Sequence, residues 1–276
     1  MKRRRPPPSP LRRRGAVRGC AKVRRQKTVI RAPTELAPGL YRLGTEQVNW
    51  YLLETGSGLL AIDAGFPKLA DTLEQDLAKA GLSTDRVEAV VLTHSDGDHT
   101  GVARALQERG ARVLIHEADE PSLRKPGPKG GDASLPKLLA NLRRPEVRRI
   151  LGHTIRYGGG RPTKIEGAET FKDGDGLPGG LTAVHTPGHT RGHCALLHRD
   201  RRVLFAGDAL IDHELVTKGR GPQVMPRYTN IDTSQAVASL RAIEALDGEV
   251  DLLLFGHGEP WEGGIPAALR SARGDG

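Results

Sequence analysis

The stretch VVLTHSDGDHTG, residues 90–101, places several ionisable side chains directly after an apolar run. His94 and Asp96 are two residues apart, so an extended chain would point both side chains the same way. Asp98 and His99 are adjacent and face apart unless the chain turns, which the glycine before them permits. Imidazole and carboxylate groups are common ligands of Zn²⁺, Fe²⁺ and Mn²⁺. We therefore interpret this loop as one that serves two neighbouring metal ions.

Three later segments have the same character, because in each an apolar run ends in a turn of small residues with His or Asp. These segments are VHTPGHTRGH (184–193), LFAGD (204–208) and LLFGHG (253–258). A strand that ends in a glycine turn presents a side chain rigidly at the edge of a sheet. Four such turns with ligand-type residues predict one shared metal site.

Strand-like runs alternate with helical spacing, which indicates an α/β architecture. Helices are expected over residues 67–81, 101–110 and 135–149. The runs predicted as strands are LYRLGT (40–45), VNWYLLETG (48–56), GLLAIDAGF (58–66), VEAVVLTH (87–94), ARVLIH (111–116), GLTAVHTP (180–187), HCALLHRD (193–200), RRVLFAGD (201–208) and VDLLLFGH (250–257).

The charge of the chain is unevenly distributed. The formal net charge is +9, yet residues 1–28 alone hold twelve Lys and Arg and no acid. The remaining 30 basic residues face all 33 acidic ones, so residues 29–276 carry about −3. Because the first 28 residues are rich in Pro and Arg and poor in apolar side chains, we expect a disordered basic tail. A tether for an anionic surface or nucleic acid and an organelle address are the alternatives.

Residues 120–164 form a second basic segment, which we interpret as a cap inserted into the body at 29–276. From Pro121 to Lys164 there are eleven Lys and Arg against Asp132 and Glu146. Its charge would attract an anionic acyl or leaving group, although a solvated basic helix face is the simpler interpretation.

The spacing of these residues resembles the metallo-β-lactamase superfamily, whose pattern is His-x-His-x-Asp-His after a buried strand, a later His, a bridging Asp and a final His. The resemblance covers about residues 35–265 and implies a four-layer αβ/βα sandwich with two metal ions at one edge of its sheets. Glyoxalase-II-like and lactonase-like members are the nearest functional models. The resemblance implies these site residues: His94, Asp96 and His189 for the first metal, Asp98, His99 and His257 for the second, and Asp208 bridging both.

Two residues are expected to support these ligands by hydrogen bonds. The IDAG turn around Asp63 is similar to the family's early Asp-x-Gly turn, whose aspartate holds the metal ligands. His193 follows the predicted ligand His189 and could orient it, although plain packing is an equal alternative. No substrate-binding residue is identified.

Asp96 departs from the pattern, since the family has a second His there. Either Asp96 is only an acidic loop residue and the first metal site is impaired, or its carboxylate is a ligand. As a ligand, Asp96 would join Asp98, Asp208 and one hydroxide to give −4 against two divalent cations. Such a neutral cluster should be a weaker Lewis acid than the usual one. More oxygen ligands also favour Fe²⁺ or Mn²⁺, although the site would still bind Zn²⁺ where Zn²⁺ is the more available metal.

The expected function is metal-dependent hydrolysis of a small ester, thioester or lactone by a metal-bridging hydroxide, with Asp98 orienting the nucleophile or moving its proton. Phosphodiester cleavage is one alternative, because the tail and cap are basic. A redox function is another, since flavodiiron proteins of the superfamily place a carboxylate where Asp96 stands. A non-catalytic metal-binding protein is the last.

Composition limits the partners and the location. No run approaches the roughly 18 apolar residues of a membrane-spanning helix, and two cysteines cannot form a disulfide scaffold. We expect a cytoplasmic enzyme with a small-molecule substrate and no membrane partner, and with nucleic acid bound only if the tail binds it. The sequence leaves the oligomeric state open.

Overall fold

A computed structural model describes residues 30–274 apart from residues 128, 134, 135, 137–139, 160, 161 and 214–219. The predicted basic tail at 1–28 therefore lies outside the described residues. None of the helices in the described ranges combines the length and the apolar character needed to span a bilayer.

The first sheet is built from the N-terminal half of the chain. Its first four strands pair antiparallel with one another, and the pairs from the fourth strand to the seventh are parallel. Its strands, in spatial order, are β1 (Ile30–Ala37), β2 (Leu40–Thr45), β3 (Asn49–Glu54), β4 (Leu59–Ile62), β5 (Val87–Val91), β6 (Arg112–His116) and β7 (Glu169–Phe171).

The second sheet comes from the C-terminal half. Its spatial order is β14 (Leu252–Phe255), β11 (Val203–Gly207), β10 (Cys194–His198), β9 (Leu181–His185) and β8 (Gly176–Leu177). Strands β11 and β14 are parallel, so their carboxyl ends lie at the same edge. Strands β12 (Ile211–His213) and β13 (Arg220–Gln223) pair antiparallel as a small separate sheet.

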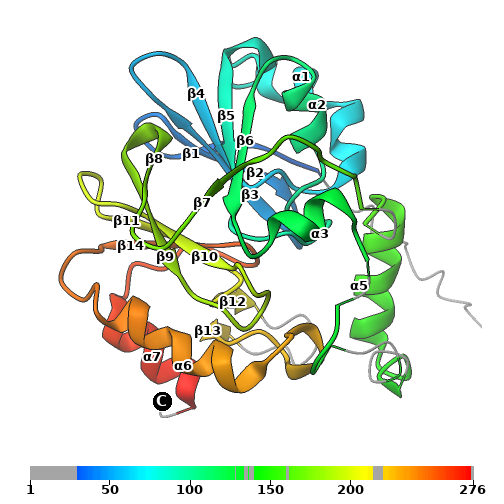
Figure 1. The fold of residues 1–276 in the computed structure, drawn as a ribbon, viewed down its shortest axis with the longest axis vertical. Helices are drawn as coiled ribbons and strands as arrows, with labels where there is room; N and C mark the ends of the chain where they lie inside the picture. The colour runs from blue at the N-terminus through cyan, green and yellow to red at the C-terminus, as the bar shows by residue number, and fades with distance from the viewer. Residues whose placement is uncertain are drawn as a thin grey trace, which may run out of the picture.

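The two sheets face each other, and helices cover the outer side of each. One apolar cluster lies between the sheets and includes Tyr51, Leu196 and Phe205. A second cluster lies under α1 (Leu73–Ala78) and α2 (Ala103–Gln107), and a third lies under α6 (Thr233–Glu244) and α7 (Ile265–Arg273). Figure 1 shows these two helix pairs on opposite sides of the molecule. The predicted four-layer sandwich is thus confirmed.

Helices in the first half are shorter than the sequence predicts. The expected helix at 67–81 is a 3₁₀ turn followed by α1, and the one at 101–110 is reduced to α2. Gly81 lies at the end of the first segment, and Gly101 and Gly110 lie at the two ends of the second; helix propensity is low there because glycine is the poorest helix former after proline. The short 3₁₀ helices are Pro67–Asp71, Thr84–Arg86, Pro178–Gly180 and Arg227–Thr229.

The segment predicted as a cap contributes α3 (Glu120–Arg124) and α5 (Pro145–Arg156). The predicted helix 135–149 is wrong in two respects: residues 141–144 form a turn and a bend, and the helix that follows continues beyond residue 149 to Arg156. Pro145 stands in the first turn of α5 and lacks a backbone N–H, so it starts a helix and cannot continue one. In Figure 1, α5 stands at the side of the sandwich, away from the two outer helix pairs.

Candidate metal centre

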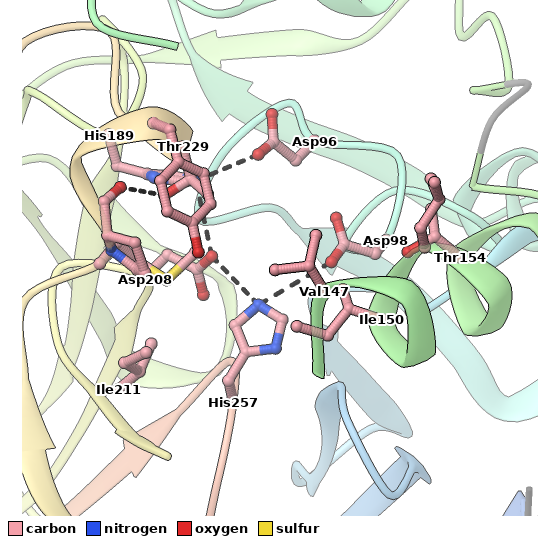
Figure 2. A pocket seen from close by; sticks show the side chains of 14 residues that line it. Asp96, Asp98, Val147, Ile150, Thr154, His189, Asp208, Ile211, Thr229 and His257 are labelled. Carbon is pink, nitrogen blue, oxygen red and sulfur yellow. Dashed lines mark hydrogen bonds and ion pairs between the residues drawn. The ribbon is translucent and has the colours of Figure 1, made fainter. Parts of the chain in front are cut away.

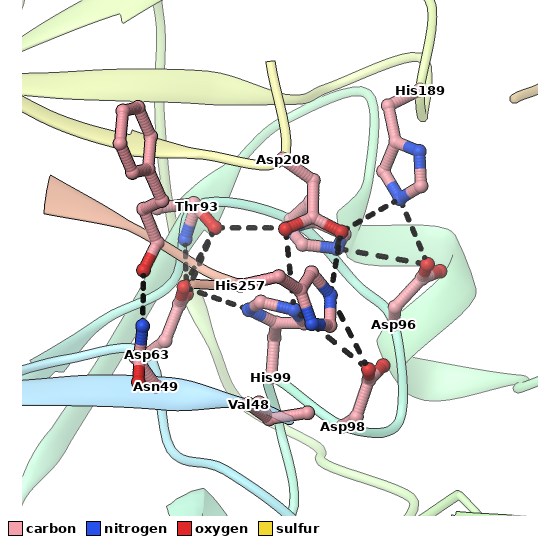
Figure 3. Close-up of polar contacts among 12 residues, drawn as sticks. Val48, Asn49, Asp63, Thr93, Asp96, Asp98, His99, His189, Asp208 and His257 are labelled. Atoms are coloured by element: carbon pink, nitrogen blue, oxygen red, sulfur yellow. Dashed lines mark hydrogen bonds and ion pairs between the residues drawn. The ribbon is translucent and has the colours of Figure 1, made fainter. Parts of the chain in front are cut away.

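All seven predicted ligands converge at one edge of the two sheets. His94, Asp96, Asp98 and His99 follow β5 in the first sheet. The other three come from the second sheet, after strands β9, β11 and β14, and are His189, Asp208 and His257. Side chains from distant segments meet here because strands of both sheets end at this edge (Figure 3).

The seven side chains form two groups that share one carboxylate. Possible ligand atoms of His94, Asp96 and His189 all lie within 4.8 Å of one another, and so do those of Asp98, His99 and His257. We call these groups the first cluster and the second cluster. They are the sets that the family resemblance implies for the two metals.

Asp208 lies between the clusters. Its Oδ2 is 3.5 Å from His189 Nε2 and 3.2 Å from His257 Nε2, while its Oδ1 is 3.6 Å from His99 Nε2. Figure 3 shows these interactions spreading from Asp208 to histidines of both clusters. A carboxylate in this position is able to bridge two metal ions.

The histidines of the second cluster direct unprotonated Nε2 atoms toward the centre. His99 Nδ1 lies 2.9 Å from Asp63 Oδ2, and His257 Nδ1 lies 2.5 Å from the backbone oxygen of Gln47. Both partners only accept hydrogen bonds, so each Nδ1 carries the proton. In the neutral ring, Nε2 therefore keeps its lone pair for a cation.

The first cluster has the same arrangement. The Thr93 hydroxyl lies 2.9 Å from Asp63 Oδ2 and donates its proton to that carboxylate, so it accepts from His94 Nδ1 at 2.9 Å. His189 Nδ1 donates to Asn230 Oδ1 at 3.0 Å, and the Asn230 amide nitrogen donates to the Met225 oxygen. His94 and His189 thus also direct Nε2 at the centre.

Buried atoms at the centre lack hydrogen-bond partners, as metal ligands would. Among the described residues, His94 Nε2, His99 Nε2 and Asp208 Oδ1 are buried without one. Buried polar atoms are normally satisfied, so these atoms point to an ion between them. A metal held tetrahedrally at about 2.1 Å separates its ligand atoms by roughly 3.4 Å. The observed separations of 3.0–3.9 Å fit that requirement.

Electrostatics at the centre also favour bound positive charge. Burial lowers the pKa of His99, but Asp208, Asp63 and Asp98 outweigh burial and raise that pKa to about 10. Burial raises the pKa of Asp208, yet His257 and His99 hold it well below its ordinary value. The carboxylates therefore attract cations, whether protons on imidazole or metal ions.

Asp63 holds the loop that carries the first four predicted ligands. Its carboxylate accepts from the Thr93 backbone N–H at 2.8 Å as well as from His99 and the Thr93 hydroxyl. Its backbone has φ +58°, a left-handed conformation that Asp tolerates better than most residues. The expected support by Asp63 is thus present in the geometry.

His193 makes a different contact from the one the sequence suggested. Its Nε2 accepts from the Asp208 backbone N–H at 2.9 Å, and its Nδ1 donates to the Thr186 hydroxyl at 2.8 Å. Burial holds the pKa of His193 well below its ordinary value, so the ring is neutral. His193 therefore positions the bridging carboxylate, and it is Asn230 that orients His189.

Asp119 is a buried side chain of the site that sequence reasoning missed. It follows β6, and its two oxygens accept from Ser95 N at 3.0 Å and Gly192 N at 2.7 Å. It thereby joins the loop after β5 to the loop that carries His189. Its place after a strand end was an available signal, since the predicted ligands share it. The amide of Asn230 gave no such signal.

Gly256 lets the end of β14 pack directly against the two clusters. A Cβ atom at this position would overlap Asp208 Oδ1 and His99 Cε1. Only glycine lets β14 approach the two clusters this closely.

A cavity of about 250 Å³ opens onto the clusters. Asp96, Asp98, His189, Asp208 and His257 form its polar end (Figure 2). Apolar side chains supply much of its remaining wall: Val147, Ile150 and Leu151 from α5, with Ile211, Met225 and Pro226 from the second half of the chain. Helix α5 therefore covers the site with an apolar face.

Comparison with known proteins agrees with this geometry. The sequence profile described as the metallo-beta-lactamase superfamily matches residues 43–257. The probable metallo-hydrolase YflN of Bacillus subtilis (strain 168) is 30% identical over 83% of this chain and 87% of its own length.

Two further similarities come from an enzyme and a solved structure. The acyl-coenzyme A thioesterase MBLAC2 of Homo sapiens is 29% identical over 75% of this chain and 68% of its own length. The crystal structure of a metallo-beta-lactamase family protein from Thermus thermophilus superimposes with a TM-score of 0.59 at 26% identity. That match covers 87% of this chain and 79% of the other.

Proposed function

The chain belongs to the metallo-β-lactamase superfamily as a metallo-hydrolase, and from this premise we propose that it hydrolyses a small ester, thioester or lactone with an apolar acyl part. The cavity is the observation that carries the proposal. Its polar end is formed by the two clusters and much of its wall is apolar, which suits a reacting carbonyl with a hydrocarbon chain behind it. An extended polyanion such as nucleic acid gains little from apolar walls.

We assign the metal ligands as the clusters group them. His94, Asp96 and His189 would hold one ion, Asp98, His99 and His257 a second, and Asp208 would contact both. Zn²⁺ is the expected metal, with Fe²⁺ or Mn²⁺ as alternatives. A divalent metal bound there supplies Lewis-acid activation of water and of the substrate carbonyl.

Asp98 is the group of this chain best placed to handle the proton. Its side chain is 28% exposed and lines the cavity, whereas Asp208 is 2% exposed and enclosed by histidines. Its Oδ2 lies 3.8 Å from His257 Nε2 and 3.9 Å from His99 Nε2. An oxygen that is both exposed to the cavity and held by the cluster is able to accept the proton of an attacking water.

Charge on the outer side of α5 supports a thioester with an anionic leaving group as the first substrate to test. The thiol released from an acyl-coenzyme A carries phosphates, which arginine binds well. The similarity to an acyl-coenzyme A thioesterase adds to this support. The exposed arginines on or beside this helix are Arg143, Arg144, Arg148, Arg149 and Arg156.

The test is a substrate panel on the full chain loaded with Zn²⁺, Mn²⁺ or Fe²⁺. It would include butyryl- and hexanoyl-coenzyme A, p-nitrophenyl butyrate, a γ-lactone, a chromogenic β-lactam and bis-p-nitrophenyl phosphate. We expect the highest kcat/KM on one of the thioester, ester or lactone substrates. In Asp208→Asn that kcat/KM should fall by about 10²-fold or more. A preference for the phosphodiester, or activity unchanged in Asp208→Asn, would overturn the proposal.

A further inference from the structure

Lys129, from the segment that also contains α3 and α5, reaches the first cluster. Its Nζ lies 3.0 Å from His189 Nε2 and forms an ion pair with Asp96 Oδ2. It also donates to the backbone oxygen of Thr229 at 3.2 Å, and its side chain is 21% exposed. The ammonium group thus contacts two of the three side chains assigned to the first metal.

A metal ion and this ammonium group need the same atoms. His189 Nδ1 donates to Asn230, so Nε2 has a single lone pair directed at the cluster. That lone pair accepts either a hydrogen bond from Lys129 or a bond to a metal. Asp96 Oδ2 lies 3.0 Å from His189 Nε2 and is already paired with the ammonium group, so a metal ion bound there would meet a second positive charge beside its carboxylate ligand.

The segment that carries Lys129 is fixed in place. Asp132 N donates to the Ile231 oxygen at 2.8 Å, and the Asp132 carboxylate accepts from Arg227 Nε at 3.0 Å and Thr233 N at 3.2 Å. Gly131 has φ +72°, and a Cβ there would overlap the Ile231 oxygen. These contacts dock the loop beside Asn230, the residue that orients His189. Lys129 is therefore held near the cluster by its loop as well as by its charge.

The aspartate at position 96 makes the contact possible. A neutral imidazole there, as in the pattern of the superfamily, would offer an ammonium group no negative charge, whereas a carboxylate does. Asp96 lines both the apolar cavity and a neighbouring cavity of about 460 Å³, and Lys129 is among the residues that line the latter. Lys129 thus approaches Asp96 from the side of the second cavity.

We propose that Lys129 is a resident cation of the first cluster, so that the second cluster binds its metal first and the first cluster takes one only when Lys129 withdraws. The inference rests on the proposed metal ligands and concerns how they are loaded. It predicts two binding steps of unequal affinity. It also couples the second metal to the position of the loop around Lys129.

The test is metal binding rather than activity. The full chain, stripped of metal with a chelator, would be titrated with Zn²⁺ by calorimetry and with Co²⁺ by its visible absorption. We expect one tight equivalent and a second that is at least about tenfold weaker, a difference of roughly 1.4 kcal/mol. In Lys129→Met the second equivalent should bind roughly 10- to 100-fold more tightly, while the first changes little.

Lys125→Met is the matched control, because Lys125 is an exposed lysine of the same segment. It should leave both binding steps as they are in the unaltered chain. An equal gain in Lys125→Met and Lys129→Met would mean a general effect of charge and would overturn the proposal. Two equally tight equivalents in the unaltered chain would overturn it as well.

Asp96→His gives an independent check. It removes the carboxylate that pairs with Lys129 and should also strengthen the second equivalent. Adding Lys129→Met to this variant should then give less than the sum of the two single effects, as for side chains in direct contact. Full additivity would contradict direct competition. If the chain takes up no metal in any variant, the metal ligands themselves are wrong, and the proposed function fails with them.

Discussion

Asp63 combines an unusual backbone conformation with three accepted hydrogen bonds, and it illustrates how single side chains organise the centre. It is 3% exposed, and its carboxylate sets the direction of His99 directly and of His94 through Thr93. Each histidine has its proton placed by an acceptor outside the cluster. Ligand orientation is therefore built into the protein before any metal binds.

Asp63→Asn should weaken metal binding by about 10- to 100-fold. An amide has only one acceptor oxygen, so it cannot accept hydrogen bonds from His99, Thr93 N and the Thr93 hydroxyl as the two carboxylate oxygens do. Asn tolerates the left-handed backbone at this position, so the fold should remain. The measurement is Zn²⁺ affinity with far-UV circular dichroism as the check on folding. Asp76→Asn is the control, since Asp76 is a buried aspartate of α1 paired with Lys79; a comparable loss there would refute the specific role of Asp63.

Helix α5 is amphipathic, and its two sides have different tasks. Val147, Ile150 and Leu151 line the apolar cavity, while Ile155 on the same helix is 62% exposed. His153 fixes the helix to the body, with Nε2 3.1 Å from the Thr45 hydroxyl and its ring tilted against Phe66. The helix thus covers the clusters without contributing a predicted ligand.

Ile150→Asn should lower kcat/KM for hexanoyl substrates by about tenfold, because a polar group would face the acyl chain. The loss for acetyl substrates should be smaller, since less of an acetyl group reaches the apolar wall. Ile155→Asn changes the same residue type on the exposed side and should have little effect on either substrate. Equal losses for both chain lengths in Ile150→Asn would show that the cavity does not bind the acyl chain.

His153 should make α5 sensitive to acid. The pKa of His153 is lowered from 6.5 to about 4, chiefly by burial; Asp98 opposes this shift, and Arg156 and Arg149 contribute to it. Above pH 6.5 His153 is neutral in both the folded and the unfolded chain, so it does not make stability depend on pH. Between pH 6.5 and about 4 His153 is protonated in the unfolded chain but stays neutral in the folded chain. The free energy of unfolding therefore falls as the pH falls through this range.

Thermal unfolding of the unaltered chain and of His153→Gln, measured from pH 7.5 to 4, checks this expectation. The melting temperature of the unaltered chain should fall more steeply than that of the variant below pH 6.5. Parallel curves across that range would exclude His153 as the titrating group.

The two sheets meet at the centre, and the predicted ligands come from both. Four follow β5 in the first sheet, and the other three follow β9, β11 and β14 in the second. A metal bound here would cross-link the two halves of the sandwich. Metal binding and global stability should therefore be coupled.

Zn²⁺ at about 100 times its dissociation constant should stabilise the chain by about 2.7 kcal/mol, because only the folded state offers the complete site. Differential scanning calorimetry with and without a chelator measures this gain. Asp208→Asn should reduce it, since Asp208 contacts both clusters. An unfolding temperature that is the same with metal and with chelator would contradict the coupling.

Much of the sandwich was predictable, because buried strands have a local signature. All nine apolar runs predicted as strands contain one. The strands that were missed are short or polar: β1 carries Pro33 and lies at the edge of its sheet, where proline is tolerated, and β8 has only two residues. Helix α5 was misplaced because its position depends on packing over the cavity and on Pro145 as its start.

The sequence alone determined the residue types and their order at the ends of the strands. That order carried the resemblance to the superfamily, and the resemblance implied the four layers and the seven side chains that lie together in the structure. Only the tertiary structure could decide the contacts made through space between distant segments. Asn230 on His189, His193 on the Asp208 backbone and Lys129 on Asp96 join residues that are 15 to 41 positions apart along the chain. No local pattern encodes such pairs, because they depend on how two sheets and an inserted segment dock.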